Sequence, residues 1–281
     1  MSLHDRPRLL EALVATALEA GAEVWRHFQG HVEVMTKDDL SPVTAADQAA
    51  EAIILKALVA AAPEVPVVAE EEAAAGRIPD VSGAFFLVDP LDGTKEFIRK
   101  GHDFTVNIGL IEAGAPTLGV VYAPALSRLF AGDVVNGLAW TADVPPGSSD
   151  TRKRRPIRVR QHGARLCAVA SKSHDTPGTE AYLAEIGCAE RVSIGSSLKF
   201  ALLAAGEADI YPRPAPTMEW DTAAGDAVLR AAGGRVFDLD GAPFAYGKPR
   251  FFNEGFVATA TYNAPPLRPF MGADPLASQI S

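Results

Sequence analysis

The chain has 281 residues, of which 48% are hydrophobic and 22% charged, which is an ordinary globular composition and excludes a disordered, collagen-like or coiled-coil chain. Its formal net charge of −9 excludes a general nucleic-acid-binding protein, because polymeric nucleic acids are bound through basic surfaces. A phosphate-bearing ligand would therefore need a local cluster of Lys and Arg, or bound metal ions.

The first half of the chain combines two helices with a group of short strands. Apolar residues at three- and four-residue steps predict an amphipathic helix over 7–28. A second helix should begin at Thr44, with Thr44 and Asp47 as a capping pair, and end before Pro63. Apolar runs predict strands over 65–69, 84–88, 104–112, 117–122 and 129–133. Turn residues at 113–116 predict a hairpin, so we expect a largely antiparallel sheet.

Residues 141–156 are rich in Pro, Gly, Ser and charge, which predicts a solvated linker that includes the basic cluster 152–155. We place there the boundary between an N-terminal α+β sub-domain, 1–145, and a C-terminal α/β sub-domain, 156–281. In the second sub-domain, predicted strands alternate with predicted helices. The strands cover 166–170, 208–211, 235–238 and 256–259, and the helices cover 179–185, 197–205 and 222–232.

The cysteines and the length of the apolar runs indicate the cellular compartment in which the protein is expected. Cys167 and Cys188 lie far apart in the chain and form no Cys-x-x-Cys motif, so we expect both to be reduced. The N-terminal segment mixes charged with apolar residues and lacks the apolar core of a signal peptide. No charge-free apolar run reaches 18 residues, so no membrane-spanning segment is expected. These features predict a cytoplasmic protein, with loose attachment to the inner face of the cell membrane as the open alternative.

The stretch AFFLVDPLDGTKEFIRKG, residues 84–101, carries the strongest chemical signal. An apolar strand ends at Asp89, and Asp92 follows three positions later. The two carboxylates can therefore converge on one point, joined by the carbonyl of Leu91. Oxygen ligands of this kind suit hard cations such as Mg²⁺. The alternative is an Asx turn with a helix cap and no ligand.

The next two residues add a second feature and exclude one class of enzyme. Gly93 allows a tight turn into a short helix, and the amides of Gly93 and Thr94 would face a phosphate at its start. Haloacid-dehalogenase phosphatases carry Asp-x-Asp-Gly-Thr after such a strand, and LDGT matches its end. Their nucleophilic aspartate would fall at position 90, which is Pro90. A covalent aspartyl-phosphate is therefore excluded.

Two further carboxylates lie at the ends of predicted elements. Glu70 opens an acidic triplet, 70–72, directly after a strand, and Asp221 precedes a helix. The alternative for Glu70 is a solvated helix start, and the alternative for Asp221 is a helix N-cap. Brought together, Glu70, Asp89, Asp92 and Asp221 would repel one another unless two or three divalent cations lay among them.

The early Glu-Glu, DPLDGT at 89–94 and WDTAAG at 220–225 together resemble three signatures of the inositol monophosphatase superfamily of Mg²⁺-dependent, lithium-sensitive phosphatases. Further matching segments extend the resemblance over 37–260: KDDLSPVTAADQAA, FTVNIGL, LGVVYAP, SKSH, IGSSLKF and YPR. The resemblance implies a layered αβαβα sandwich of the sugar-phosphatase type, of α+β or α/β class. The second half is most similar to the 3′(2′),5′-bisphosphate nucleotidase branch.

Carried over position by position, the resemblance implies a complete site. The implied metal ligands are Glu70, Asp89, the Leu91 carbonyl, Asp92 and Asp221, around two or three Mg²⁺ ions. The implied catalytic residues are Asp47, Glu70 and Thr94, which orient water for in-line attack and accept its proton. The implied substrate contacts are Gly93, Thr94, His174, Ser196, Lys199, Arg213 and Asp221. Three of these residues keep an alternative without a ligand: His174 as an exposed loop residue, Ser196 as a helix cap and Lys199 as a solvated residue on a helix.

The reaction that the resemblance implies is hydrolysis of the 3′-phosphate of adenosine 3′,5′-bisphosphate (PAP) to AMP and phosphate, with inhibition by Li⁺ or Ca²⁺. The corresponding 5′-phosphosulfate (PAPS), which would give APS in sulfate assimilation, is an expected second substrate. Two other classes stay open: an inositol monophosphatase or fructose-1,6-bisphosphatase, and a nucleotide sensor without hydrolysis. The expected partner is a small nucleotide and no polymeric nucleic acid. Because the superfamily is often dimeric, a homodimer is an alternative to a monomer.

Overall fold

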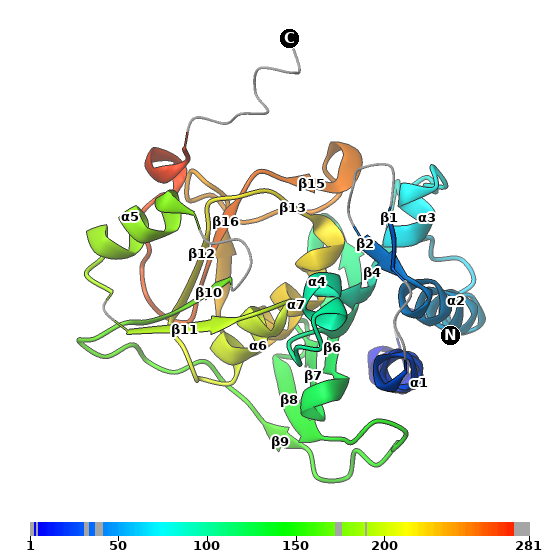
Figure 1. Cartoon of the computed structure of the whole chain (residues 1–281). Coiled ribbons are helices and arrows are strands. Elements are labelled where there is room, and N and C mark those ends of the chain that lie inside the picture. The colour runs from blue at the N-terminus through cyan, green and yellow to red at the C-terminus, as the bar shows by residue number, and fades with distance from the viewer. Residues whose placement is uncertain are drawn as a thin grey trace.

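The computed structural model of the chain describes residues 3, 5–30, 34–36, 42–171, 176–188 and 190–272 (Figure 1). Both long helices predicted for the first half are confirmed, as are the five strands predicted there. The elements of this half are α1 (Arg6–Gln29), β1 (Val34–Thr36), β2 (Pro42–Thr44), α2 (Ala45–Ala61), β3 (Val67–Ala69), α3 (Glu70–Ala74), β4 (Phe85–Asp92), α4 (Thr94–Ile98), β5 (Thr105–Glu112), β6 (Ala115–Ala123), η1 (Pro124–Leu126), β7 (Arg128–Asp133) and β8 (Leu138–Asp143).

The strands and helices predicted for the second half are also found, with ends within two residues of the prediction. The elements of this half are β9 (Arg155–Pro156), β10 (Cys167–Ser171), α5 (Pro177–Glu185), β11 (Glu190–Ile194), α6 (Leu198–Ala204), β12 (Ile210–Arg213), β13 (Thr217–Met218), η2 (Glu219–Asp221), α7 (Ala223–Ala231), β14 (Arg235–Phe237), η3 (Pro249–Phe251), β15 (Phe252–Asn253), β16 (Phe256–Thr259) and η4 (Arg268–Phe270). Across the described residues, the search for a helix able to span a membrane finds none.

The predicted linker over 141–156 is wrong at both ends. Strand β8 extends to Asp143, and β9 pairs with β8 as an edge strand of the same sheet. The basic cluster is held in place, since the Arg155 guanidinium pairs with Asp143 and the Arg154 guanidinium lies 4.2 Å from the ring centroid of Trp140. Composition misled the prediction because edge strands tolerate Pro and charged residues.

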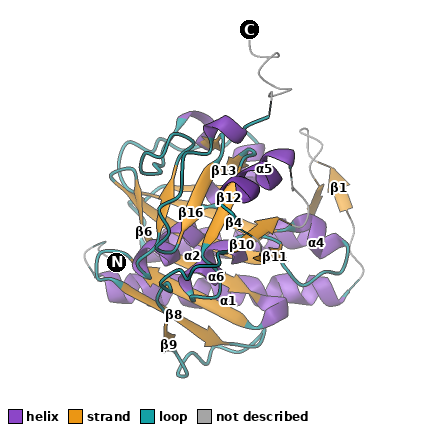
Figure 2. Ribbon diagram, turned by 90° about the vertical axis from the view of Figure 1, so that its left-hand side faces the viewer, coloured by secondary structure: helices purple, strands orange, loops and turns teal. Residues whose placement is uncertain are grey.

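Two sheets and three helical layers form the sandwich that the resemblance implied. The larger sheet has seven strands in the order β3-β4-β5-β6-β7-β8-β9, and the smaller has five in the order β11-β10-β12-β16-β14, within the described residues. Helices α1 and α2 cover one face of the larger sheet, with α1 lying along it (Figure 2). Helices α6 and α7 lie between the two sheets, and α5 covers the far side of the smaller one (Figure 1). The αβαβα layering is confirmed.

Helix α7 belongs to the second half of the chain but packs on the sheet of the first half. Gly109, Gly119 and Gly132, one on each of three adjacent strands, let its backbone approach closely. A Cβ at Gly119 would lie 2.3 Å from the carbonyl oxygen of Ala224 in α7. This contact ties the two halves together, while the sub-domain boundaries at 145 and 156 stay a prediction.

Replacing Gly119 with Ala is expected to destabilise the fold by about 1–3 kcal/mol, because overpacking forces α7 away from the sheet. The measurement is the midpoint of urea unfolding, compared with wild type. Gly83→Ala is the matched control, since a Cβ there meets no described atom within 4 Å. Equal midpoints for Gly119→Ala and Gly83→Ala would contradict the close packing of α7.

Candidate active site

A cavity of about 290 Å³ lies where β4 ends, between the starts of α3, α4 and α6 and the turn η2. It gathers nearly all of the residues that the sequence singled out. Those lining it are Glu70, Asp89, Leu91, Asp92, Gly93, Thr94, Ser196, Lys199, Arg213 and Asp221. Asp47 joins the site through a hydrogen bond to Thr94. The remaining candidate, His174, lies outside the described residues, so its role stays a prediction.

The two aspartates of the DPLDGT block reach the cavity because the pairing of β4 with β5 shifts register between them. Pro90 has no N–H for the ladder, which favours an irregularity at this point. The Asp89 carboxylate accepts the N–H of Leu91 at 3.0 Å. The Asp92 carboxylate accepts the N–H of Ser197, at the start of α6, at 2.5 Å. The fold therefore holds both carboxylates in fixed directions, one of them through a residue 105 positions away.

Thr94 and Asp47 form a linked pair beside these carboxylates. The Thr94 hydroxyl lies 3.3 Å from Oδ1 of Asp47 and 3.1 Å from the carbonyl oxygen of Leu91, and can donate to either. The other oxygen of Asp47 accepts the N–H of Thr44, which confirms the predicted capping pair. Gly93 has a φ of 95°, and a Cβ there would lie 2.8 Å from a backbone oxygen, so the turn that presents Thr94 requires glycine.

Glu70 is the first residue of α3, and its orientation depends on a residue that the sequence analysis missed. The carboxylate of Glu51, on α2, accepts the N–H groups of Glu71 at 2.8 Å and Glu72 at 3.0 Å. Burial raises the pKa of Glu51 to about 7. Glu51 could have been found from the sequence, because it lies four residues after Asp47, one helical turn further along, on the apolar side of the predicted helix.

Asp221 does not cap α7, so the capping alternative is wrong. The N-cap of α7 is Thr222, and Asp221 is the last residue of the short 3₁₀ turn η2. One oxygen of the Asp221 carboxylate accepts the N–H of Met218 at 2.8 Å. Its side chain lines the cavity, and η2 packs against β4, which carries Asp89 and Asp92.

The carboxylates of the cavity influence one another's ionisation. Burial raises the pKa of Asp89 and of Asp221 well above the usual range of an aspartate, and the charges of Glu70 and Asp92 add to this effect. Burial also raises the pKa of Asp92 to about 6, although the ammonium of Lys199 acts in the opposite direction. Such a wall is stable in its ionised form only with cations beside it.

The donor set fits Mg²⁺ with water ligands. Within the part of the chain that the structure describes, no three acidic, His or Cys side chains lie close enough together to enclose an ion on their own. Mg²⁺ usually keeps several waters and takes only one or two carboxylates from a protein, so carboxylates spread around a cavity suit it. A cation among them would also relieve the repulsion that raises their pKa values.

Two cationic side chains, Lys199 and Arg213, also line the cavity and are called its cationic wall below. Lys199 is only 4% exposed, so its reading as a solvated helix residue is wrong; its ammonium donates to the carbonyl oxygen of Ser196 at 2.5 Å. Burial lowers the pKa of Lys199 to about 8. Arg213 is 8% exposed, and its Nε is buried without a hydrogen-bond partner among the described residues. Ser196 lines the cavity, and its hydroxyl also accepts the N–H of Leu198 at 3.4 Å.

A layered α+β fold that brings four carboxylates and two buried cations to one cavity is typical of enzymes that hydrolyse phosphate esters with bound metal ions. The model of the inositol monophosphatase family matches residues 5–264. The chain belongs to the inositol monophosphatase family, which is metal-dependent.

Named relatives and solved structures agree with this placement. The 3′(2′),5′-bisphosphate nucleotidases CysQ of Salmonella typhimurium (strain LT2) and Escherichia coli (strain K12) are 43% and 42% identical to the chain; the matches cover 89% and 88% of this chain and 99% and 98% of those proteins. The crystal structure of CysQ from Bacteroides thetaiotaomicron has a TM-score of 0.76 and 36% identity, over 93% of this chain and 100% of that one. An inositol monophosphatase from Anabaena has a TM-score of 0.71 and 27% identity, over 91% and 92%.

Proposed function

We propose that the chain is a Mg²⁺-dependent 3′(2′),5′-bisphosphate nucleotidase that hydrolyses the 3′-phosphate of adenosine 3′,5′-bisphosphate to AMP and phosphate. The observation that carries this proposal is a single cavity lined both by the carboxylates of Glu70, Asp89, Asp92 and Asp221 and by the buried cations Lys199 and Arg213. A ligand with two phosphates can place one at each wall. The printed name of the Salmonella and E. coli relatives supports the same activity here.

The acidic wall would hold the metal and the phosphate to be hydrolysed. Glu70, Asp89, the Leu91 carbonyl, Asp92 and Asp221 are the residues that would hold two or three Mg²⁺ ions. Bound Mg²⁺ supplies a nucleophile by lowering the pKa of water, and it neutralises charge on the phosphate.

The Thr94 hydroxyl orients the attacking water, with Asp47 as the acceptor that holds this hydroxyl in place. Glu70 takes the proton from the water. The backbone amides of Gly93 and Thr94 donate to the oxygens of the phosphate. Attack is in line and direct, with no covalent phosphoenzyme.

The cationic wall would bind the second phosphate. The Nε of Arg213, which has no hydrogen-bond partner in the described part of the chain, and the ammonium of Lys199 are buried donors. A charged group binds an anion more strongly in such a position than at the surface. The 5′-phosphosulfate analogue, PAPS, presents the same 3′-phosphate and a similar anionic group, so it would be a second substrate that yields APS.

The test is phosphate release from adenosine 3′,5′-bisphosphate, inositol-1-phosphate and fructose-1,6-bisphosphate, each with Mg²⁺ and with added Li⁺, Ca²⁺ or EDTA. We expect kcat/KM to be at least about tenfold higher for the bisphosphate nucleotide, which corresponds to roughly 1.4 kcal/mol of additional binding. EDTA should abolish turnover, and Li⁺ and Ca²⁺ should inhibit it.

Each other outcome points to a different function. Preference for inositol-1-phosphate or fructose-1,6-bisphosphate would overturn the nucleotide proposal and leave the metal site in place. Tight binding of the nucleotide without phosphate release would indicate a sensor.

A further inference from the structure

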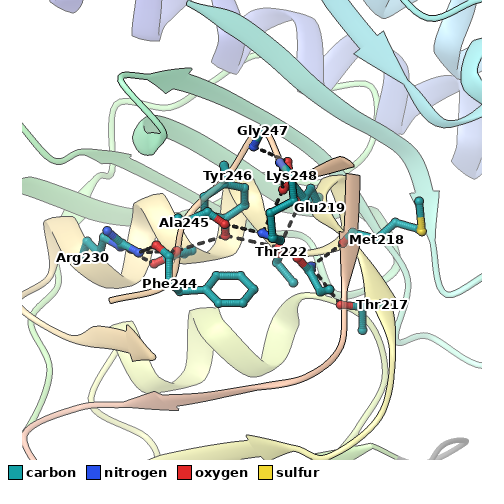
Figure 3. A network of polar contacts seen from close by, with 12 residues as sticks. Thr217, Met218, Glu219, Thr222, Arg230, Phe244, Ala245, Tyr246, Gly247 and Lys248 are labelled. Carbon is teal, nitrogen blue, oxygen red and sulfur yellow. Dashed lines mark hydrogen bonds and ion pairs between the residues drawn. The ribbon is translucent and has the colours of Figure 1, made fainter. Parts of the chain in front are cut away.

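Glu219 is a fully buried carboxylate two residues before Asp221. Its Oε2 accepts the N–H of Gly247 at 2.8 Å, and its Oε1 accepts the N–H of Lys248 at 2.9 Å (Figure 3). The ammonium of Lys248 also lies 2.8 Å from Oε1. All three contacts join the 3₁₀ turn η2 to one distant stretch of chain.

That stretch, residues 244–253, is called the bracing segment below. It contacts the surroundings of η2 at two further points. The side-chain amide of Asn253 donates to the carbonyl oxygen of Met218 at 3.0 Å, and β15 pairs with β13 there. The hydroxyl of Tyr246 lies 3.2 Å from the hydroxyl of Thr222 (Figure 3). The residues before and after η2 are therefore attached to the same brace as Glu219.

The turn η2 needs such a brace. It has three residues, and 3₁₀ turns of this length have few hydrogen bonds of their own and poor hydrogen-bond geometry. The Asp221 carboxylate takes its direction from the N–H of Met218, which belongs to the same short segment. Any displacement of η2 would therefore move the Asp221 carboxylate away from the rest of the acidic wall.

We propose that Glu219 is a positioning residue, which fixes η2 against the bracing segment so that Asp221 faces the cavity in the direction that Mg²⁺ requires. The inference rests on the proposed function only in taking Asp221 as a Mg²⁺ ligand. A buried carboxylate is a costly way to stabilise a fold, because an apolar side chain of similar size avoids the desolvation penalty. What the carboxylate adds is direction: two backbone N–H groups and an ammonium define a single orientation of the turn.

The test is calorimetric titration of the full-length protein with Mg²⁺, without substrate, for wild type, Glu219→Gln and Lys248→Met. Glutamine retains the shape of the side chain but turns an NH₂ group towards one of the donors. We expect Mg²⁺ to bind Glu219→Gln about 10–100-fold more weakly, as for other residues that orient metal ligands. Lys248→Met keeps both backbone donors and should show a smaller loss. With turnover as a second readout, the Mg²⁺ concentration for half-maximal activity should rise, and kcat at saturating Mg²⁺ should recover.

Val14→Ala, in the buried face of α1, is the matched control for stability alone. It should lower the Tm and leave Mg²⁺ affinity at the wild-type value. If Glu219→Gln lowers the Tm in the same way and binds Mg²⁺ like wild type, Glu219 is merely structural and the inference is wrong. If Glu219→Gln does not fold, Lys248→Met decides: wild-type Mg²⁺ affinity in that variant overturns the inference.

The two proposals fail differently. A wild-type protein that binds Mg²⁺ but does not hydrolyse bisphosphate nucleotides would contradict the proposed function. The Mg²⁺ titration would still test the role of Glu219 in that case. A wild-type protein that does not bind Mg²⁺ would overturn the inference about Glu219.

Discussion

Asp92→Asn is expected to reduce phosphate release from adenosine 3′,5′-bisphosphate by roughly 10²–10³-fold, the size found when one strong electrostatic contact to a reacting group is removed. The substitution keeps the shape of the side chain and an oxygen that can accept the N–H of Ser197. It removes a negative charge from the acidic wall, so the proposed Mg²⁺ site would lose one of its carboxylates. The measurement is kcat/KM at saturating Mg²⁺.

The same variant should fold as well as wild type or better when no metal is present. The fold raises the pKa of Asp92 from 3.8 to about 6, which means that the side chain is mostly ionised at neutral pH but that its charge lowers the stability of the folded state there. A neutral amide relieves that penalty, so the Tm in EDTA should not fall. Asp143→Asn, at an exposed carboxylate paired with Arg155, is the control and should retain full activity. Turnover like that of wild type in Asp92→Asn would contradict the assignment of the acidic wall.

Elements with a local signal were predictable from the sequence. The periodic apolar face of α1, the capping pair Thr44 and Asp47, and the hairpin of β5 and β6 each depend on residues near one another in the chain. The convergence of Asp89 and Asp92 belongs to the same group, because it was predicted from two carboxylates three positions apart at the end of a strand, and the shift in strand register between them agrees with it.

Features that depend on contacts distant in sequence were missed. Strand β11 was not predicted, although Val192 and Ile194 alternate with Arg191 and Ser193, because the alternating stretch is short and four of the five residues of the strand are exposed, so it has no buried apolar face. The contact of Ser197 with Asp92 and that of Glu51 with α3 involve residue types that read as an ordinary helix start and an ordinary helical acid. Only the fold brings these groups beside the site.

The proposed function explains how a chain with a net charge of −9 would bind a polyanion. Three divalent cations at the acidic wall would bring about +6 against −4 from its four carboxylates, which leaves roughly +2 locally. Lys199 and Arg213, which line the same cavity, add two further positive charges. The charge that the substrate meets is therefore opposite in sign to that of the whole molecule.

Arg213→Ala is expected to lower kcat/KM for adenosine 3′,5′-bisphosphate by about two orders of magnitude, as when one partner of a buried charge pair is lost. The loss should be mainly in KM, because the proposed contact is with the phosphate that does not react. For inositol-1-phosphate, which has no second phosphate to place at the cationic wall, kcat/KM should change by no more than a few-fold.

The Tm of Arg213→Ala has to be measured beside its activity. Removing the positive charge relieves its repulsion of Lys199 and removes a buried Nε that has no hydrogen-bond partner among the described residues. It also removes the donor to the carbonyl oxygen of Pro216 at 3.3 Å and the charge that favours the ionised form of Asp221. Arg165→Ala is the control, because Arg165 is largely exposed and pairs with Glu190. It should leave both substrates unaffected. Equal losses on both substrates in Arg213→Ala would mean that Arg213 supports the metal-binding half of the cavity and does not select for a second phosphate.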